Sequence, residues 1–266
     1  MATPKSRLDD TLVQLGHFAT KSQALRAIMA GQVLLNGQPC IKAGQAISEQ
    51  QHALLSVTQP SRFVSRGGYK LLAALEQWQL PTQGIIALDV GASTGGFTDC
   101  LLQHEAKHVI AVDVGQAQLD WKLRTDPRVS VLEKTNARHL QASHLGGLAP
   151  VDVAVCDVSF IGLDKVLPVM ASLTRPSPQS WMMALLKPQF EAQPYLTPTE
   201  AKAFDGVIRC ATLRQRIVDG TLAALAEQLA GQWLCMGQHP SPVVGPKGNI
   251  EWLTLWRPCN TVKASV

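Results

Sequence analysis

The chain has 266 residues, of which 46% are hydrophobic and 17% are charged, so it is a globular protein of one or two domains and not a disordered or fibrous chain. A net charge of +4 permits a nucleic-acid partner without requiring one, and the six cysteines form no Cys-x-x-Cys pair, so neither a metal site nor a disulfide framework is indicated. The polar N-terminus lacks a signal-peptide core and no apolar run is long enough to span a bilayer, so we expect a cytoplasmic protein without membrane contacts.

Residues 6–58 are predicted to form a compact unit of helices and short strands. A helix over 7–16 and a second helix over 20–31 each end at a glycine. An apolar segment then runs into Asn36-Gly37, a dipeptide that favours a tight hairpin turn. Residues 53–57 read as a strand that closes a small sheet.

A linker over 59–62 separates this unit from a polar, glycine-rich stretch at 65–70 and from the apolar helix that follows it. Lys70 stands where that helix opens, a position at which the helix dipole disfavours a cation. A cation in such a place indicates a functional residue, with a solvated lysine as the alternative.

The most informative stretch is an apolar strand that ends in Asp89, followed by Gly91-Ala92-Ser93-Thr94-Gly95-Gly96-Phe97 and an amphipathic helix. Glycines let the backbone turn tightly and approach a ligand, and the free N–H groups of the next helix face that ligand. The stretch lacks the Gly-Lys-Ser/Thr ending of a phosphate loop, and its spacing differs from the G-x-G-x-x-G fingerprint for dinucleotides. S-adenosylmethionine (SAM) is the third ligand considered, and a plain strand–turn–helix corner is the alternative.

Three further apolar strands follow, each with a polar residue at its carboxyl end. Asp113 ends the segment 108–113, where a carboxylate can accept hydrogen bonds from a ribose diol. Asn136 follows the segment 129–133, within reach of an adenine edge, and Asp157 ends a fourth strand. Four such strands predict a doubly wound α/β sheet with a binding crevice at their carboxyl ends.

The rest of the chain supplies two more charged residues at element ends. Residues 181–186 form a fifth buried strand that runs into Lys187, and Pro188 stops both strand pairing and helix. An amphipathic helix is expected over about 213–229, and a loop that contains Glu251 enters a last strand. Each charged residue alone is more often part of a structural ion pair, but a charge held by a proline at a strand end is a candidate for a functional site.

Two resemblances cover nearly the whole chain. The N-terminal unit resembles the alpha-L RNA-binding domain, the type found in ribosomal protein S-four, through Arg7-Leu8-Asp9, Ser22-Gln23-Ala24, Gly31-Gln32-Val33 and Asn36-Gly37. The chain as a whole resembles the TlyA (hemolysin A) family, through the segments 65–71, 89–99, 111–115, 157–161, 186–191 and 245–251. The resemblance implies an alpha-L domain over residues 1–59 and a Rossmann-like, FtsJ-type SAM-dependent methyltransferase domain over residues 60–266.

The same resemblance implies a SAM-dependent ribose 2′-O-methyltransferase that acts on cytidine in ribosomal RNA, with ribosomal RNA or ribosomal subunits as its partner and no metal. It implies a catalytic tetrad of Lys70, Asp157, Lys187 and Glu251, in which Lys187 is the candidate base or oxyanion-stabilising group. The implied cofactor-binding residues are Asp89, Gly91, Ala92, Ser93, Thr94, Gly95, Gly96, Phe97, Asp113, Asn136 and Asp157. The implied RNA-binding residues are Arg7, Lys21, Arg26, Arg62 and Arg66, although by composition alone Lys21 and Arg26 fit an ordinary solvated helix face.

Two other function classes stay open at this point. A non-catalytic ribosome-binding or assembly factor would keep the fold, and the intact tetrad argues against it. A membrane-active hemolysin is suggested only by the family's name, and the lack of a spanning segment argues against it. The sequence departs from the family at 192–198, where Ala-Gln-Pro-Tyr-Leu-Thr-Pro replaces a Gly/Lys-rich stretch, so the family's loop shape and any RNA contact there are not carried over.

Overall fold

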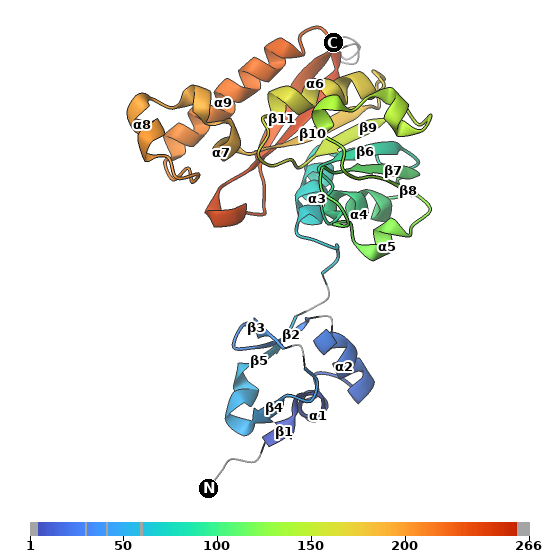
Figure 1. Cartoon of the computed structure of the whole chain (residues 1–266), viewed down its shortest axis with the longest axis vertical. Helices are drawn as coiled ribbons and strands as arrows, with labels where there is room; N and C mark the ends of the chain where they lie inside the picture. The colour runs from blue at the N-terminus through green and yellow to red at the C-terminus, as the bar shows by residue number, and fades with distance from the viewer. Residues whose placement is uncertain (1–4, 30, 41, 59–60, 260–266) are drawn as a thin grey trace. The chain divides into compact units, whose positions relative to one another are not determined.

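The computed structural model describes residues 5–29, 31–40, 42–58 and 61–259 of the chain. The chain divides into two compact units, Met1–Arg62 and Phe63–Val266, coloured blue and cyan to red in Figure 1. The sequence predicts a change of unit in the same region, at residues 59–62.

The N-terminal unit contains two helices, α1 (Leu8–Gln14) and α2 (Lys21–Met29), and two small antiparallel sheets. In one sheet β1 (Lys5–Arg7) pairs with β4 (Ala46–Ser48), and in the other β2 (Val33–Leu35) lies between β3 (Gln38–Pro39) and β5 (Leu55–Val57). The predicted hairpin turn is confirmed, since Asn36 and Gly37 both have positive φ angles, 50° and 76°. The closing strand begins at Leu55 and not at residue 53, because Glu49–Leu54 forms the 3-10 helix η1.

The second unit is built on a seven-stranded sheet with the order β11-β12-β10-β9-β6-β7-β8. Five strands run parallel, as the sequence predicts: β6 (Ile86–Val90), β7 (His108–Val112), β8 (Val129–Leu132), β9 (Val153–Cys156) and β10 (Trp181–Leu186). The strands β11 (Trp233–Pro240) and β12 (Trp252–Pro258) complete one side as an antiparallel pair. The sequence did not predict β11, in which buried and exposed positions alternate over only part of its length.

Helices cover both faces of this sheet, which confirms the predicted doubly wound architecture (Figure 1). One core contains residues of α3 (Gly67–Trp78), α4 (Gly96–Gln103) and α5 (Trp121–Arg124), and the other contains residues of α6 (Leu163–Leu173) and α9 (Ala211–Gln228). Side chains alternate between the two cores along each strand, as Ala87 and Leu88 do in β6. Short helical segments complete the unit: α7 (Pro188–Glu191), α8 (Pro198–Ala203), η2 (Ala137–His139), η3 (Ala142–Leu145), η4 (Gln193–Tyr195) and η5 (Pro246–Gly248).

The order of the strands reverses at β6. The chain proceeds from β6 through β7 to β8 on one side, and then returns to place β9 on the other side of β6. In open α/β sheets ligands bind in the crevice at the carboxyl ends of the strands beside such a reversal. The ends of β6 and β9 are therefore the place at which the fold predicts a binding site.

Candidate active site

A cavity of about 600 Å³ lies at the carboxyl ends of β6, β9 and β10. Its walls come from the start of α3, the end of β6 with the glycine-rich loop, the residues after β9, the residues after β10, Gly206, and the loop before β12. All four residues of the candidate tetrad line this cavity, together with the glycine-rich loop. A volume of this size is typical of pockets that hold a small molecule.

The tetrad side chains form one connected series of ion pairs. Lys70 Nζ lies 2.7 Å from Glu251 Oε2 and 3.0 Å from Asp157 Oδ2. The other oxygen of Asp157, Oδ1, lies 2.6 Å from Lys187 Nζ. Asp157 therefore joins the two lysines, and the two positive and two negative charges of the series balance.

The sheet register explains why these residues meet. In the antiparallel pair of β10 and β12, Leu186 lies opposite Trp252, so Lys187 and Glu251 are the next residues outward at the same edge. Lys187 has extended backbone angles (φ −111°, ψ 97°), which the following Pro188 favours. Asp157 directly follows β9, the parallel neighbour of β10.

The tetrad is mostly withdrawn from solvent. Lys70, Lys187 and Glu251 are 8%, 7% and 1% exposed. Burial of charged groups is costly unless each finds a partner, which is why the series is continuous. Glu251 Oε1 is the exception, because this buried oxygen has no hydrogen-bond partner within the described part of the chain. This oxygen packs against Gly245, where an added Cβ atom would collide with it.

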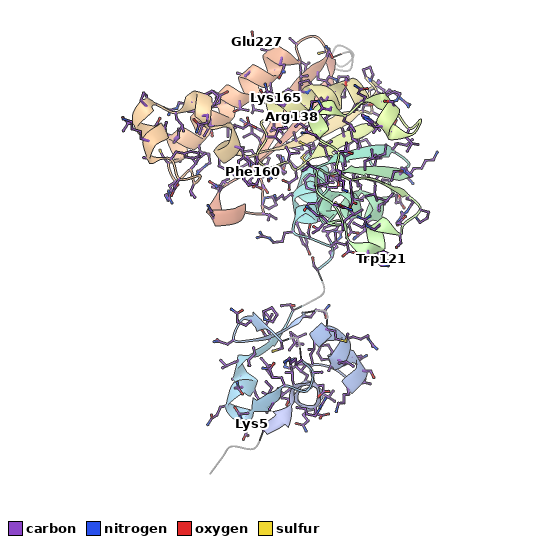
Figure 2. All side chains as sticks on the ribbon, in the orientation of Figure 1. Lys5, Trp121, Arg138, Phe160, Lys165 and Glu227 are labelled. Atoms are coloured by element: carbon purple, nitrogen blue, oxygen red, sulfur yellow. The ribbon has the colours of Figure 1, made fainter. Side chains whose placement is uncertain are left out.

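Three residues beside the tetrad were not singled out from the sequence. Lys187 Nζ donates a hydrogen bond to Ser159 Oγ (2.8 Å) and lies 5.9 Å from the centre of the Phe190 ring. Phe160 is 90% exposed and lies beside α7 (Figure 2). The centre of its ring is 5.0 Å from the centre of the Phe190 ring. Ser159 and Phe160 follow Asp157 within one motif, which is the only indication of them that the sequence offers.

The strand before the glycine-rich loop, β6, places a buried carboxylate in the same cavity. Asp89 is fully buried at the end of β6, and its Oδ2 accepts a hydrogen bond from Thr98 Oγ1 (2.6 Å). Its Oδ1 has no hydrogen-bond partner among the residues that the structure describes. Burial raises the pKa of Asp89 to about 7, the bond from Thr98 opposes this rise, and the charges of Asp157 and Asp113 add to it.

Two glycines of the loop are also required by packing. A Cβ atom at Gly95 would collide with the side chains of Leu119 and Leu123, and Gly95 does not belong to the lining of the cavity. A Cβ atom at Gly96 would collide with Ser65 and with the backbone of the α3 start. Packing against Leu119 and Leu123 thus gives a second reason for a glycine at position 95, and its predicted contact with a ligand stays a prediction.

The remaining loop residues divide between the cavity and other roles. Those that line it are Gly91, Ala92, Ser93, Thr94, Gly96 and Phe97. Asp113 follows β7, and its two oxygens accept hydrogen bonds from the backbone N–H groups of Ser93 (2.8 Å) and Gly115 (2.7 Å). Asn136 lies at the start of η2, where its Oδ1 accepts a hydrogen bond from Arg138 N (3.1 Å), and it is not part of the cavity lining. This position does not support the predicted contact of Asn136 with an adenine.

Asn249 ties two walls of the cavity together. Its Oδ1 accepts a hydrogen bond from Ile208 N (3.0 Å), and its Nδ2 donates one to Gly206 O (2.9 Å). Gly206 and Asn249 both line the cavity. The segment that departs from the family at 192–198 packs nearby in a small separate core with Ile208 and Ile217.

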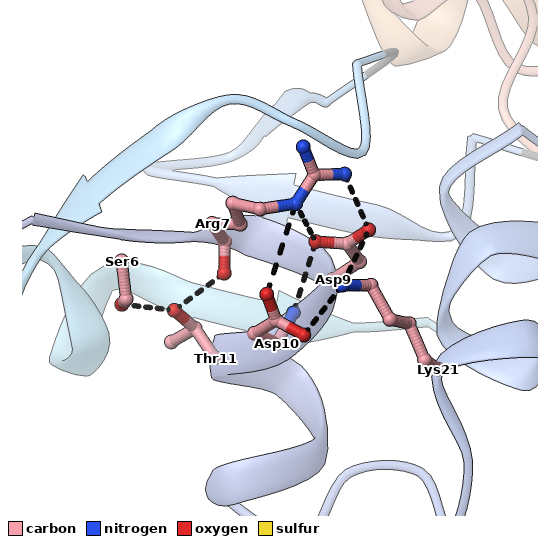
Figure 3. Close-up of polar contacts among 6 residues, drawn as sticks. All are labelled: Ser6, Arg7, Asp9, Asp10, Thr11 and Lys21. Carbon is pink, nitrogen blue, oxygen red and sulfur yellow. Dashed lines mark hydrogen bonds and ion pairs between the residues drawn. The ribbon is translucent and has the colours of Figure 1, made fainter.

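Two candidate RNA-binding residues of the N-terminal unit are held in ion pairs (Figure 3). Arg7 donates two hydrogen bonds to the buried carboxylate of Asp9, at 3.0 and 2.8 Å, and Lys21 Nζ lies 2.7 Å from Asp10 Oδ1. The guanidinium of Arg7 holds the pKa of Asp9 below its usual range. The charges of this cluster balance, so these two cations are less available to phosphates than the sequence suggests. All five candidates are exposed, Arg7 and Lys21 included, and Arg66 lines the cavity.

Two negative observations concern the described residues only. No helix in this part of the chain combines the length and the apolar character that a membrane crossing requires. Within the same residues, no three His, Cys, Asp or Glu side chains are grouped so that they could hold a metal ion.

Comparison with known families assigns both units. Residues 63–257 match the FtsJ-like methyltransferase family, and residues 6–51 match the S4 domain. The chain is 42% identical to the 16S/23S rRNA (cytidine-2′-O)-methyltransferase TlyA of Mycobacterium tuberculosis, over 98% of this chain and 92% of that protein. It is 36% identical to Hemolysin A of Brachyspira hyodysenteriae, over 93% and 98% of the two chains. A solved structure from Streptococcus thermophilus, which carries the name hemolysin, superposes with a TM-score of 0.69 at 36% identity and covers 97% of this chain and 90% of that chain.

Proposed function

Since this chain belongs to the TlyA family of FtsJ-like methyltransferases, we propose that it transfers a methyl group from SAM to the ribose 2′-oxygen of cytidine in ribosomal RNA. The observation that carries the proposal is the convergence of Lys70, Asp157, Lys187 and Glu251 in one cavity with the glycine-rich loop. A network with a purely structural role need not line a cavity of about 600 Å³, as these four side chains do.

The residues of the cavity fit SAM. Its amino-acid end carries an ammonium group, and the unpartnered, buried Oδ1 of Asp89 is an acceptor suited to it. Asp113 holds the backbone of Ser93 in place and stands at the strand end where a ribose is commonly bound. When bound, SAM supplies an electrophilic methyl group for transfer to an oxygen nucleophile.

The tetrad would orient the acceptor hydroxyl. A ribose 2′-OH is a weak nucleophile near neutral pH and must lose its proton as it attacks. Lys187 is the residue proposed to contact this oxygen, as base or as stabiliser of the developing negative charge, while Asp157 fixes the position of its Nζ. Lys70 would hold Asp157 and Glu251 in place through its two short ion pairs. Accurate placement of two reacting groups is itself worth several powers of ten in rate.

RNA binding is proposed for both units. The S4-type domain, assigned here to residues 1–59, would bind structured RNA, and the methyltransferase domain over 60–266 would receive the target nucleotide. Arg26, Arg62 and Arg66 are the proposed phosphate contacts, since all three are exposed. Phe160, exposed beside the cavity, offers a flat apolar surface on which an unstacked base can lie. An enzyme that modifies ribosomal RNA works where ribosomes are, so we propose a cytoplasmic location.

Purified protein, radiolabelled SAM and ribosomal subunits from cells without the gene test this proposal. The expected result is label in ribosomal RNA that nuclease digestion and mass spectrometry identify as 2′-O-methylcytidine. Lys187→Ala serves as the matched control and should incorporate little label. If the wild-type protein binds subunits but transfers no methyl group, the chain is a binding or assembly factor that has kept the fold, and the proposal fails.

A further inference from the structure

We propose that Ser159 is a positioning residue of the active site, which holds the ammonium group of Lys187 toward the cavity. The inference rests on the proposed function of the tetrad. Ser159 Oγ accepts a hydrogen bond from Lys187 Nζ at 2.8 Å, and both residues line the cavity. Ser159 thereby extends the series of Glu251, Lys70, Asp157 and Lys187 by a fifth, uncharged member.

The geometry of an ammonium group gives Ser159 this role. A lysine ammonium has three N–H bonds in a tetrahedral arrangement. Lys187 Nζ uses one of them to donate a hydrogen bond to Ser159 Oγ at 2.8 Å, and it forms an ion pair with Asp157 Oδ1 at 2.6 Å. The hydrogen bond to Ser159 and the ion pair with Asp157 together restrict the orientation of the ammonium group at the lining of the cavity. With Asp157 as its only acceptor, Nζ could rotate about that one contact.

The two lysines of the tetrad differ in this respect. Lys70 donates hydrogen bonds to two carboxylates, Asp157 at 3.0 Å and Glu251 at 2.7 Å, so two negative charges hold it in position. Lys187 has one carboxylate and one hydroxyl. A hydroxyl fixes direction without adding a second negative charge, which suits a lysine that must interact with a substrate oxygen as well.

The backbone around Ser159 is itself restrained. Phe160, the next residue, has a φ angle of 63°, a left-handed conformation that is strained for a bulky side chain and is found where the surroundings impose it. The loop is tied down a few residues later, because Leu163 N donates a hydrogen bond to Glu191 Oε1 at 2.8 Å. Glu191 lies in α7, which starts directly after Lys187. Both partners of the bond between Ser159 and Lys187 are therefore anchored to the same short segment.

Steady-state methyl transfer by Ser159→Ala and Ser159→Thr variants of the full chain tests the proposal, with ribosomal subunits and labelled SAM as substrates. Ser159→Ala should lower kcat about tenfold, with KM for SAM and for RNA within twofold of wild type, because the substrates still bind but the ammonium is no longer aligned. Ser159→Thr keeps the hydroxyl and should recover kcat to within about threefold. Ser172→Ala is the matched control, since this exposed serine of α6 bonds only Val169 O and should leave kcat unchanged.

The outcomes separate this proposal from the proposed function. If the wild-type protein methylates RNA and Ser159→Ala has the wild-type kcat, Ser159 does not position Lys187. If Ser159→Ala and Ser159→Thr are equally impaired, or if KM rises in place of a fall in kcat, the role of Ser159 is packing or binding and the proposal is overturned. Failure of the function itself would appear differently, as absence of methyl transfer by the wild-type protein.

Discussion

The buried carboxylate of Asp89 makes SAM binding dependent on pH. Burial raises its pKa to about 7, so that in the free protein about half of the molecules carry the charge at pH 7. An ammonium ligand binds the ionised form, and the α-amino group of SAM stays protonated below about pH 7.7. Affinity should therefore fall as pH falls: at pH 5.5 only about 3% of Asp89 is ionised, which weakens the observed Kd by about fifteenfold relative to pH 7.

Isothermal titration calorimetry with SAM between pH 5.5 and 7.5 measures this dependence. Asp89→Asn removes both the charge and the titration, so its Kd should be about 10- to 100-fold weaker than wild type at pH 7 and nearly independent of pH. Asp219→Asn, an exposed change on α9, is the matched control and should keep both the affinity and the slope. A wild-type Kd at pH 5.5 within twofold of its value at pH 7, or an equal slope in Asp89→Asn, would refute the reasoning.

The raised pKa of Asp89 also makes the stability of the free protein depend on pH, and this stability should fall as pH rises, whereas SAM affinity should increase. Its pKa is raised from 3.8 to about 7 in the native state, so the native state binds the proton more tightly than the unfolded chain does. The stabilisation from this group is complete below pH 3.8 and is lost as pH rises toward 7. A ligand ammonium removes the cost of the buried charge, so the increase in melting temperature caused by SAM should be larger at pH 7 than at pH 5.5.

Three further results are expected. Lys187→Ala should retain the wild-type affinity for SAM in calorimetry but lose a factor of about 10²–10⁴ in the rate of methyl transfer. Lys187→Arg should restore little of that rate, because guanidinium stays protonated. A Lys187→Ala variant with wild-type turnover would contradict the role given to this residue. Gly95→Val should lower the free energy of unfolding by about 2–4 kcal/mol, because valine cannot adopt φ 95° easily and would collide with Leu119 and Leu123. A variant that unfolds at the wild-type denaturant concentration but loses SAM affinity would instead favour a ligand contact at Gly95. Arg26→Glu should weaken RNA binding and reduce its salt dependence. Lys21→Glu should mainly lower the melting temperature, because the new carboxylate would repel Asp9 and Asp10. Equal losses of RNA affinity in both variants would show that Lys21 binds RNA despite its ion pairs.

The sheet and the ends of its strands were predictable because burial and chain direction leave strong patterns. Runs such as Trp181–Leu186, buried at every position, are typical of strands covered on both faces. Polar residues at the carboxyl ends of parallel strands are then brought to one edge by topology alone, which is how Asp89, Asp113 and Asp157 were found. Lys70 was indicated by its place at the start of a helix, and the motif resemblance grouped it with Glu251. Their meeting could not be inferred from local patterns, because Lys70 contacts Asp157 and Glu251 across 87 and 181 residues of the chain.

What the sequence left out depends on packing in three dimensions. The collision of a Cβ atom at Gly95 with Leu119 and Leu123 cannot be inferred from the loop spacing, since an identical spacing serves glycines that face a ligand. The hydrogen bonds of Asn249 to residues 206 and 208 join loops that the sequence separates by 41 residues or more. The ion pairs of Arg7 and Lys21 with Asp9 and Asp10 likewise depend on how α1 and α2 pack, and a pattern of charges does not reveal which cations are already neutralised.

The most direct test of the central claim is a map of 2′-O-methylcytidine in ribosomal RNA from three strains: one with the wild-type gene, one without it, and one that carries only Lys187→Ala. The proposed function predicts at least one cytidine that is methylated in the first strain and unmethylated in the other two, with equal protein levels in the first and third. Identical methylation maps in all three strains, or a site that stays methylated with Lys187→Ala, would contradict a methyltransferase whose chemistry depends on this tetrad.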